Sequence, residues 1–274
     1  MFLRFLAYLV ISGVTLPLPA VEIVAHRGAS YDAPENTMAA TRLAWQQQAD
    51  AVETDIYLGK DGKIIVFHDK TAKRTGGGRD VAIGDLTQAE ARTLDAGSWK
   101  APQFKGEKVP LLEEQIQSIP AGKRLLVEIK VGPEIVPELK RVFAATGGNE
   151  RTITVISFNY DTLVEVRKQL PALKTLWLVG HPAPNAKPAP TAKSPPSVAE
   201  MIRAAKTAKL TGLDLQHTWP LTSNDVKAIR DAGLELHVWT VNDVAVAKHW
   251  RDLGAASITT DRPAWLREQL QQSR

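Results

Sequence analysis

The chain has 274 residues, of which 44% are apolar, enough to build one large hydrophobic core or two smaller ones. Its 34 basic and 30 acidic residues leave a net charge of +4, a mild balance that points neither to nucleic acid nor to a membrane surface as a partner. The chain contains no cysteine, which excludes disulfides and thiolate metal sites.

The first 20 residues, MFLRFLAYLVISGVTLPLPA, are typical of a secretory signal peptide. One basic residue, Arg4, precedes an unbroken apolar segment that ends near Ala20, the expected cleavage position. Leu18 at the third position before the cut is larger than the usual small residue, so an uncleaved N-terminal membrane anchor is the alternative. We expect an exported protein, periplasmic or secreted, whose mature domain spans residues 21–274 and is not stably inserted in a membrane after cleavage.

Beyond residue 20, short β-branched runs alternate with amphipathic stretches. Such alternation predicts parallel strands joined by crossover helices, and the eight strands fit the length of a single (β/α)₈ TIM barrel. An open doubly wound sheet is the alternative, but no G-x-G-x-x-G follows any strand. The expected strands are residues 21–25, 50–58, 124–130, 153–158, 174–179, 210–216, 234–241 and 257–260, and the clearest helices are 37–48, 134–147, 160–170, 197–208, 223–233, 243–254 and 263–272.

Two segments depart from the alternation. An insertion follows the second strand: a hairpin over Asp61-Gly62 is expected first, and then a loop-rich tract over about residues 69–110. The second segment, residues 181–197, contains six prolines and is typical of a solvated, polyproline-prone loop. In a barrel this loop would leave the carboxyl end of the fifth strand, on the face where barrel active sites lie.

Charged residues occur on strands that should be apolar. Glu53 and Asp55 are two residues apart and leave the same face of their strand, and Glu128 shares a face of the third strand with Lys130. Three carboxylates in one barrel interior would repel one another, so a divalent cation is the preferred interpretation. All-oxygen ligation suits Mg²⁺, Ca²⁺ or Mn²⁺ rather than zinc or copper. The alternative is that Lys130, Arg27 and other cations at the barrel mouth neutralise the three groups.

Two of the six histidines are candidates for catalysis. His26 and His68 each follow a strand beside charged residues, and two imidazoles across a phosphate can serve as general acid and general base near neutral pH. A metal-ligand role for one of them is the alternative. The other four are expected to be structural, on strands at His217 and His237 and on the surface at His181 and His249.

The motifs AHRG, PENT, VETDI, VFHD, VEIK, VWTVND and TTDRP occur in this order, and together they resemble the glycerophosphodiester phosphodiesterase family over about residues 23–266. The resemblance implies a (β/α)₈ barrel that hydrolyses small-molecule glycerophosphodiesters to glycerol 3-phosphate and an alcohol. It also implies a divalent cation, Ca²⁺ or Mg²⁺, and the family's own insertion after the second strand. Its site roles would be Glu53, Asp55 and Glu128 as metal ligands, His26 and His68 as acid and base, Arg27 and Lys130 on the phosphate, and Trp239 in the wall of the substrate pocket.

Two residues of the PENT motif are given other roles. Asn36 is a good N-cap for the helix that follows. Glu35 is expected to orient Arg27 without contacting the substrate itself. Helix capping alone is the alternative for this pair. Other functions stay open: cleavage of lysophospholipid or sphingomyelin head groups, or binding of glycerophosphodiesters without catalysis. The sequence leaves open which histidine is the acid, whether water or the glycerol 2-hydroxyl attacks, and the oligomeric state.

Overall fold

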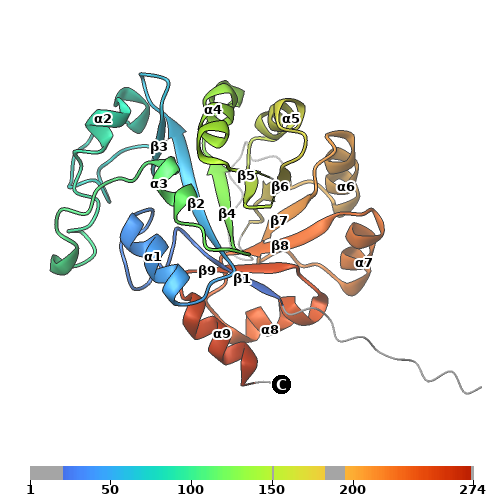
Figure 1. Ribbon diagram of the computed structural model, residues 1–274. Coiled ribbons are helices and arrows are strands. Elements are labelled where there is room, and N and C mark those ends of the chain that lie inside the picture. The colour runs from blue at the N-terminus through green and yellow to red at the C-terminus, as the bar shows by residue number, and fades with distance from the viewer. Residues whose placement is uncertain (1–20, 150, 183–194, 273–274) are drawn as a thin grey trace, which may run out of the picture.

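The computed structural model describes residues 21–149, 151–182 and 195–272, and within them eight parallel strands close into a barrel (Figure 1). The closure is made by β1, which pairs with both β2 and β9. This confirms the predicted single (β/α)₈ barrel. The strands in barrel order are β1 (Glu22–Ala25), β2 (Ala51–Leu58), β4 (Arg124–Ile129), β5 (Ile153–Ser157), β6 (Lys174–Val179), β7 (Gly212–Gln216), β8 (Glu235–Trp239) and β9 (Ser257–Thr260).

Helices surround the barrel, and a helix follows each of its strands before the next one begins (Figure 1). Several begin where the sequence offers a side-chain cap: Ser197 and Glu200 form a capping box at α6, and Thr222 and Asp225 form another at α7. The ring consists of α1 (Met38–Gln46), α3 (Leu112–Gln117), α4 (Val136–Thr146), α5 (Tyr160–Gln169), α6 (Val198–Thr207), α7 (Ser223–Asp231), α8 (Val244–Leu253) and α9 (Pro263–Gln271).

The two faces of the sheet have different chemistry. Outward-facing residues of β2 such as Val52 and Ile56 pack with the helices in the main hydrophobic core. The barrel interior holds a smaller apolar cluster, to which Leu126, Ile156 and Leu176 contribute. Because side chains alternate along a strand, Glu53 and Asp55 leave β2 on the face opposite Val52 and Ile56. The carboxylates therefore lie inside the barrel.

The insertion after β2 folds against one side of the barrel. Its first strand, β3 (Ile64–Val66), pairs antiparallel with β2, which confirms the hairpin predicted over Asp61-Gly62. The tract predicted to be loop-rich contains short helical turns: α2 (Gln88–Ala91) and 3-10 turns at Ile83–Asp85 and Pro102–Phe104. It also has its own core, which includes Phe67, Ile83 and Leu94. The insertion is thus a packed layer rather than an open loop.

The N-terminal segment expected to be a signal peptide lies outside the described residues, as do residues 183–194 of the proline-rich loop. A 3-10 turn at Pro133–Ile135 precedes α4. Among the described residues, no helix is both long enough and apolar enough to cross a membrane.

Candidate active site

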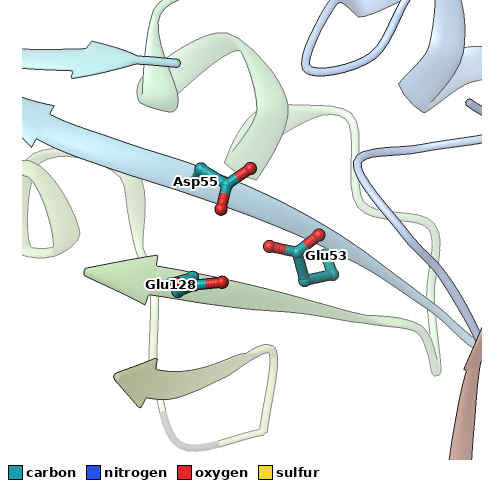
Figure 2. Close-up of side chains that lie close together, drawn as sticks. All are labelled: Glu53, Asp55 and Glu128. Carbon is teal, nitrogen blue, oxygen red and sulfur yellow. The ribbon is translucent and has the colours of Figure 1, made fainter. Parts of the chain in front are cut away.

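Three carboxylates meet inside the carboxyl-terminal mouth of the barrel (Figure 2). Glu53 and Asp55 come from β2, and Glu128 comes from β4, where it lies in register with Asp55. One oxygen of each residue lies within 4.8 Å of the others. Glu53 and Asp55 are almost completely buried. The predicted facing of all three residues is therefore confirmed.

Burial and mutual repulsion alter the ionisation of the cluster. Burial raises the pKa of Glu53 well above its usual range, and the charges of Asp55 and Glu128 raise it further. Burial and the charge of Asp55 raise the pKa of Glu128 to about 7. Burial acts in the same direction on Asp55, but Lys130 and Arg27 outweigh it and hold the pKa of Asp55 below its usual range. The cluster therefore carries less than three negative charges near neutral pH.

Two cations explain why Asp55 differs from its neighbours. Nζ of Lys130 lies 2.6 Å from Glu128 Oε1 and 3.2 Å from Asp55 Oδ1. Nε of Arg27 lies 3.4 Å from Asp55 Oδ2. The backbone N–H of Arg27 donates to Glu53 Oε2 over 2.9 Å, and the residue adopts φ 56°, a left-handed conformation uncommon for a side chain of this size. The neutralisation by Arg27 and Lys130 that we weighed as an alternative is thus present, but it is incomplete.

Two buried oxygens stay without a hydrogen bond. Within the described part of the chain, Glu53 Oε1 and Asp55 Oδ1 accept no hydrogen bond although both are shielded from solvent, and only Asp55 Oδ1 has an ion-pair partner, Lys130 Nζ at 3.2 Å. A buried carboxylate oxygen without a donor is costly and requires an explanation. A divalent cation would satisfy both oxygens together with Glu128, and three carboxylates are hard ligands suited to Mg²⁺, Ca²⁺ or Mn²⁺. The residues present therefore fit such an ion.

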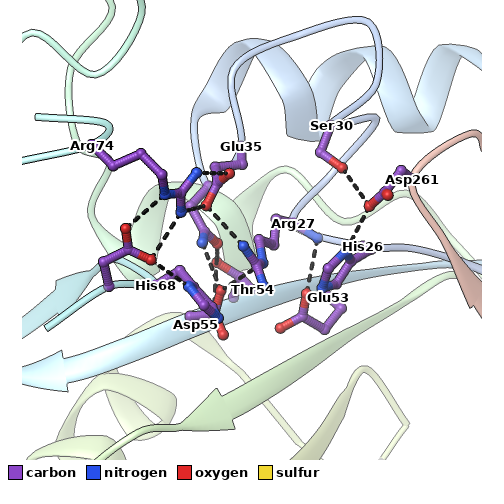
Figure 3. Close-up of polar contacts among 12 residues, drawn as sticks. His26, Arg27, Ser30, Glu35, Glu53, Thr54, Asp55, His68, Arg74 and Asp261 are labelled. Atoms are coloured by element: carbon purple, nitrogen blue, oxygen red, sulfur yellow. Dashed lines mark hydrogen bonds and ion pairs between the residues drawn. The ribbon is translucent and has the colours of Figure 1, made fainter. Parts of the chain in front are cut away.

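His26 follows β1 and is held by a residue from the far end of the chain. Its Nδ1 lies 2.6 Å from Oδ1 of Asp261, which follows β9 (Figure 3). Ser30 Oγ donates to the same oxygen over 3.0 Å, and Asn242 Nδ2 donates to Oδ2 over 2.6 Å. Burial opposes ionisation of Asp261, but the hydrogen bonds from His26, Asn242 and Ser30 lower its pKa to about 2. An ionised Asp261 therefore accepts the Nδ1 proton of His26.

His68 follows β3 and is held in the same manner by its neighbour in the chain. Its Nδ1 lies 2.7 Å from Oδ1 of Asp69. Arg74 binds both oxygens of Asp69, with Nε 2.7 Å from Oδ2 and Nη2 2.9 Å from Oδ1. Burial lowers the pKa of His68, and the charge of Arg27 lowers it further. Asp55 and Asp69 act in the opposite direction, but the net shift favours the neutral imidazole of His68.

Glu35 connects the two halves of this arrangement (Figure 3). Its Oε1 accepts from Arg27 Nη1 over 2.9 Å, and its two oxygens accept from Arg74 Nη2 and Nη1, each over 2.7 Å. Burial acts against ionisation, but the two guanidinium groups outweigh it and lower the pKa of Glu35. Glu35 therefore fixes Arg27, as the sequence predicted, and it also links Arg27 to the support of His68.

Both imidazoles leave Nε2 as the nitrogen without a hydrogen-bond partner in the described structure. Carboxylates occupy Nδ1 of both His26 and His68, whereas Nε2 of neither ring has a hydrogen-bond partner in the described ranges. A carboxylate at Nδ1 favours the tautomer that carries its proton there, so Nε2 is left to accept or donate a proton. In the view of Figure 3, Arg27 lies between the two rings.

The prediction that Asn36 caps the following helix is wrong. Thr37 is the N-cap of α1, and its side chain accepts from the backbone N–H of Ala40. Asn36 instead adopts φ 56° and donates from Nδ2 to Asp55 Oδ2 over 2.7 Å. Its Oδ1 accepts from Thr54 Oγ1 over 2.9 Å. Asn36 thus orients a carboxylate of the cluster, a contact between segments that local sequence does not reveal.

Trp239 ends β8 at the barrel mouth. Its ring meets Phe158 edge-on, with centroids 5.4 Å apart, and its Nε1 donates over 3.0 Å to the backbone oxygen of Asp214. The Asp214 side chain is 1% exposed, and its Oδ1 has no hydrogen-bond partner in the described segments. Burial and the charge of Glu128 raise the pKa of Asp214 to about 8. Asp214 is a buried neutral acid that the sequence analysis did not single out.

The remaining histidines are structural, with one difference from expectation. His237 is buried and bonds Ser257 Oγ over 2.6 Å, and His217 contacts the backbone oxygen of Trp239 over 3.4 Å. His249 is exposed, as predicted. His181 is half-buried rather than on the surface, and its ring packs 4.7 Å from that of Trp219.

Four supporting residues were missed from the sequence: Asp69, Arg74, Asn242 and Asp261. Asp69 had a local signal, because an acid directly after a candidate histidine can hold its ring. The only sequence signal for Asp261 and Asn242 was their position after a strand, because polar residues that follow barrel strands lie at the same end of the barrel. Arg74 had no signal, since it lies in the insertion, away from any strand.

Known proteins resemble this chain along most of its length. The model of the Glycerophosphoryl diester phosphodiesterase family matches residues 26–265. A glycerophosphodiester phosphodiesterase of Bacillus subtilis is 33% identical over 259 residues, covering 88% of this chain and 83% of the relative.

Solved structures agree with the family match. A phosphodiesterase of Oleispira antarctica, determined in complex with the product sn-glycerol-3-phosphate, superposes with a TM-score of 0.79 at 28% identity and covers 93% of this chain and 97% of its own. A glycerophosphodiester phosphodiesterase of Agrobacterium tumefaciens has a TM-score of 0.73 at 27% identity and covers 90% of this chain and 98% of its own. The carboxylate cluster, the two supported imidazoles and this similarity lead to one assignment. The chain belongs to the glycerophosphodiester phosphodiesterase family of enzymes.

Proposed function

We propose that this protein hydrolyses glycerophosphodiesters to glycerol 3-phosphate and an alcohol, with a divalent cation and with His26 and His68 as the acid–base pair. One observation carries the proposal: two imidazoles, each held at Nδ1 by a carboxylate, lie at the same barrel mouth as a three-carboxylate cluster with unsatisfied oxygens. A protein that only captured its ligand would need no such pair, because binding requires no proton transfer.

Glu53, Asp55 and Glu128 would hold the cation, which is Mg²⁺, Ca²⁺ or Mn²⁺ in this proposal. When bound, the cation supplies positive charge to a nonbridging phosphate oxygen and to the glycerol hydroxyls. Arg27 and Lys130 add charge on the phosphate, and Glu35 keeps the Arg27 guanidinium in place. Trp239 forms part of the pocket wall, with Phe158 against its ring.

Nε2 of His26 and Nε2 of His68 carry out the proton transfers in this proposal. One imidazole removes the proton of the attacking oxygen as its bond to phosphorus forms, and the other gives a proton to the alkoxide that leaves. The low pKa of His68 suits the base, since its Nε2 is free to accept at neutral pH. The attacking oxygen is that of water, or the glycerol 2-hydroxyl with a cyclic phosphate that water then opens.

Purified protein incubated with glycerophosphocholine tests this function. Release of glycerol 3-phosphate is expected, it should stop in excess chelator, and Mg²⁺, Ca²⁺ or Mn²⁺ should restore it better than Zn²⁺ does. Full activity in excess chelator would refute the role of the cation. Turnover of a long-chain lysophospholipid at a higher rate than glycerophosphocholine would favour the lysophospholipase D type of activity instead.

We also propose that the protein is exported and that residues 1–20 are removed. The support is the sequence pattern of Arg4, the apolar segment and Ala20. Intact-mass measurement on protein from the cell envelope should give a chain that begins at Val21. A cytoplasmic product that keeps Met1 would contradict the proposal.

A further inference from the structure

A set of exposed and half-buried aromatic and cationic side chains lies at the barrel mouth beside His26. We call it the rim patch, and it consists of Tyr31, Trp99, Lys100, Arg262 and Trp265. Tyr31 is 56% exposed and Trp99 is 38% exposed, which is unusual for large rings on a soluble surface unless they contact a partner or ligand. The roles proposed above use none of these five residues.

The cations of the rim patch cover its aromatic faces. The guanidinium carbon of Arg262 lies 4.2 Å from the ring centroid of Tyr31 and 4.5 Å from that of Trp265. Nζ of Lys100 lies 6.0 Å from the Tyr31 centroid and 5.8 Å from the Trp99 centroid. Exposed Tyr and Trp rings would otherwise suit a quaternary ammonium group. Here the protein's own cations occupy the ring faces, so an ammonium ligand would meet like charge.

No direct ion pair within the described residues neutralises the two cations of the rim patch. In the ranges that the structure describes, neither Lys100 nor Arg262 forms an ion pair; Lys100 donates to the backbone oxygen of Ser30 over 2.8 Å. The adjacent acid, Asp261, is already engaged by His26 and other donors. Arg74, which lies 5.9 Å from the Trp99 ring, is neutralised by Glu35 and Asp69. Two cations, Lys100 and Arg262, thus stand beside the single ionised carboxylate of Asp261, which leaves a net positive charge among these residues.

Hydrogen bonds link the rim patch to the His26 side of the active site, and Figure 3 draws the contacts from Ser30 through Asp261 to His26. Ser30, whose backbone oxygen anchors Lys100, donates from Oγ to Asp261, and Asp261 holds His26. The backbone N–H of Tyr31 donates to the Asp261 backbone oxygen over 3.1 Å, and Arg262 follows Asp261 directly in the chain. A substrate whose phosphate contacts Arg27 could thus extend its other end over this surface.

We propose that the rim patch is the subsite for the leaving alcohol and that it selects head groups bearing an anionic group over those bearing a quaternary ammonium. The inference rests on the proposed function, since it concerns the second half of the same diester. Lys100 and Arg262 would attract a phosphate on the head group. The active site itself would accept any glycerophosphodiester, and the rim patch would supply the preference for anionic head groups.

Three soluble diesters test the selection: bis(glycerophospho)glycerol with an anionic head group, glycerophosphoglycerol with a neutral one and glycerophosphocholine with a cationic one. The wild-type value of kcat/KM should fall in that order, through KM rather than kcat. Arg262→Gln and Lys100→Gln should each reduce the preference for the anionic substrate by about two- to fivefold, the scale of one exposed ion pair. Both variants should change hydrolysis of the neutral diester less than that of the anionic one, and added salt should remove the preference in the wild type.

Arg79→Gln is the matched control, because Arg79 is an exposed cation of the same insertion without a ring contact in the described structure. Arg262→Lys should keep most of the preference. An equal loss on all three diesters, or a preference as high in Arg262→Gln as in Arg79→Gln, would overturn the proposal. A third outcome would also overturn it: Arg262→Gln loses binding to vesicles of anionic lipid but still discriminates between the diesters. The rim patch would then be a membrane contact.

A binding measurement separates this inference from the proposed function. Calorimetric titration of the His68→Ala variant with the anionic and choline diesters gives the ratio of their Kd values without turnover. A ratio that favours the anionic diester and disappears with Arg262→Gln supports the rim patch even where no diester is hydrolysed. Equal Kd values for the two diesters would overturn the inference, even if hydrolysis itself is observed.

Discussion

Nδ1 of His26 lies 2.6 Å from Oδ1 of Asp261, although 235 positions separate the two residues in the chain. The contact exists because β1 and β9 are neighbours at the seam of the barrel, with Ala25 in register with Thr260. Each residue is the first after its strand, so barrel closure places them together. His26 therefore acquires its orientation only when the last strand has been added.

Replacing Asp261 tests that orientation. Asp261→Asn keeps the shape but removes the charge that stabilises a protonated His26, so kcat should fall at least about tenfold with little change in KM. Nitrogen-15 NMR of His26 should show an altered tautomer balance, which a merely structural change would not produce. Asp32→Asn, which changes an exposed acid in the loop that contains His26, is the control and should retain kcat and the His26 spectrum. A wild-type tautomer balance in Asp261→Asn would contradict the proposed support.

Removing the imidazoles should separate acid from base. His26→Ala and His68→Ala should each lower kcat about 10²-fold or more, the scale for losing a positioned acid or base. KM should change much less, because in the proposed binding mode Arg27 and Lys130 would still contact the phosphate. A nitrophenyl ester needs little protonation of its leaving group, so it should rescue only the variant that lacks the acid. Because burial and nearby cations lower the pKa of His68, rescue is expected for His26→Ala.

The opposite rescue would reverse these roles. Loss of less than tenfold in both variants would remove His26 and His68 from the proton transfers altogether. His249→Ala is the control, since that imidazole is exposed on α8 and should leave turnover unchanged.

Metal binding should release a proton from Glu128. Its pKa of about 7 means that a cation competes with a proton below that pH, so affinity should rise with pH at least up to about 7. Titration calorimetry with Mg²⁺ or Ca²⁺ in buffers of different ionisation enthalpy measures the proton directly. Glu128→Gln should weaken binding without unfolding the barrel, because it removes like-charge repulsion at constant shape. Glu268→Gln, an exposed control on α9, should bind as the wild type does.

Asp214 should make the metal-free protein less stable as the pH rises. Its pKa is about 8 in the folded chain and ordinary in the unfolded chain, so the folded state holds an extra proton between pH 3.8 and about 8. The free energy of unfolding should therefore fall across that window by up to about 1.4 kcal/mol per pH unit for this group. Asp214→Asn should flatten the decline measured by urea unfolding in chelator. Asp231→Asn, an exposed acid, should leave it unchanged, and an equal slope in both variants would refute the prediction.

Local patterns in the sequence were sufficient for the barrel and for the carboxylate cluster. The spacing of Glu53 and Asp55 determines that they share a face, because side chains alternate along any strand. Alternating strand and helix signals likewise require parallel pairing, and the hairpin at Asp61-Gly62 follows from its turn residues. These inferences succeeded because each depends on neighbouring positions alone.

Tertiary structure decided several contacts that support the catalytic candidates. Asn36 is a residue type that often caps helices, yet it donates to Asp55, because the Thr37 side chain caps α1 instead. Arg74 joins Asp69 to Glu35 from within an insertion whose path no strand pattern specifies.

The sequence by itself therefore determined the elements, their order and the residues that point into the barrel. The tertiary structure decided which of those residues meet across the seam, as His26 and Asp261 do. The physical reason is that strand and helix periodicity is set by backbone geometry over a few residues. Barrel closure and the path of the insertion depend instead on packing between segments far apart in the chain, and this packing leaves no periodic trace in the sequence.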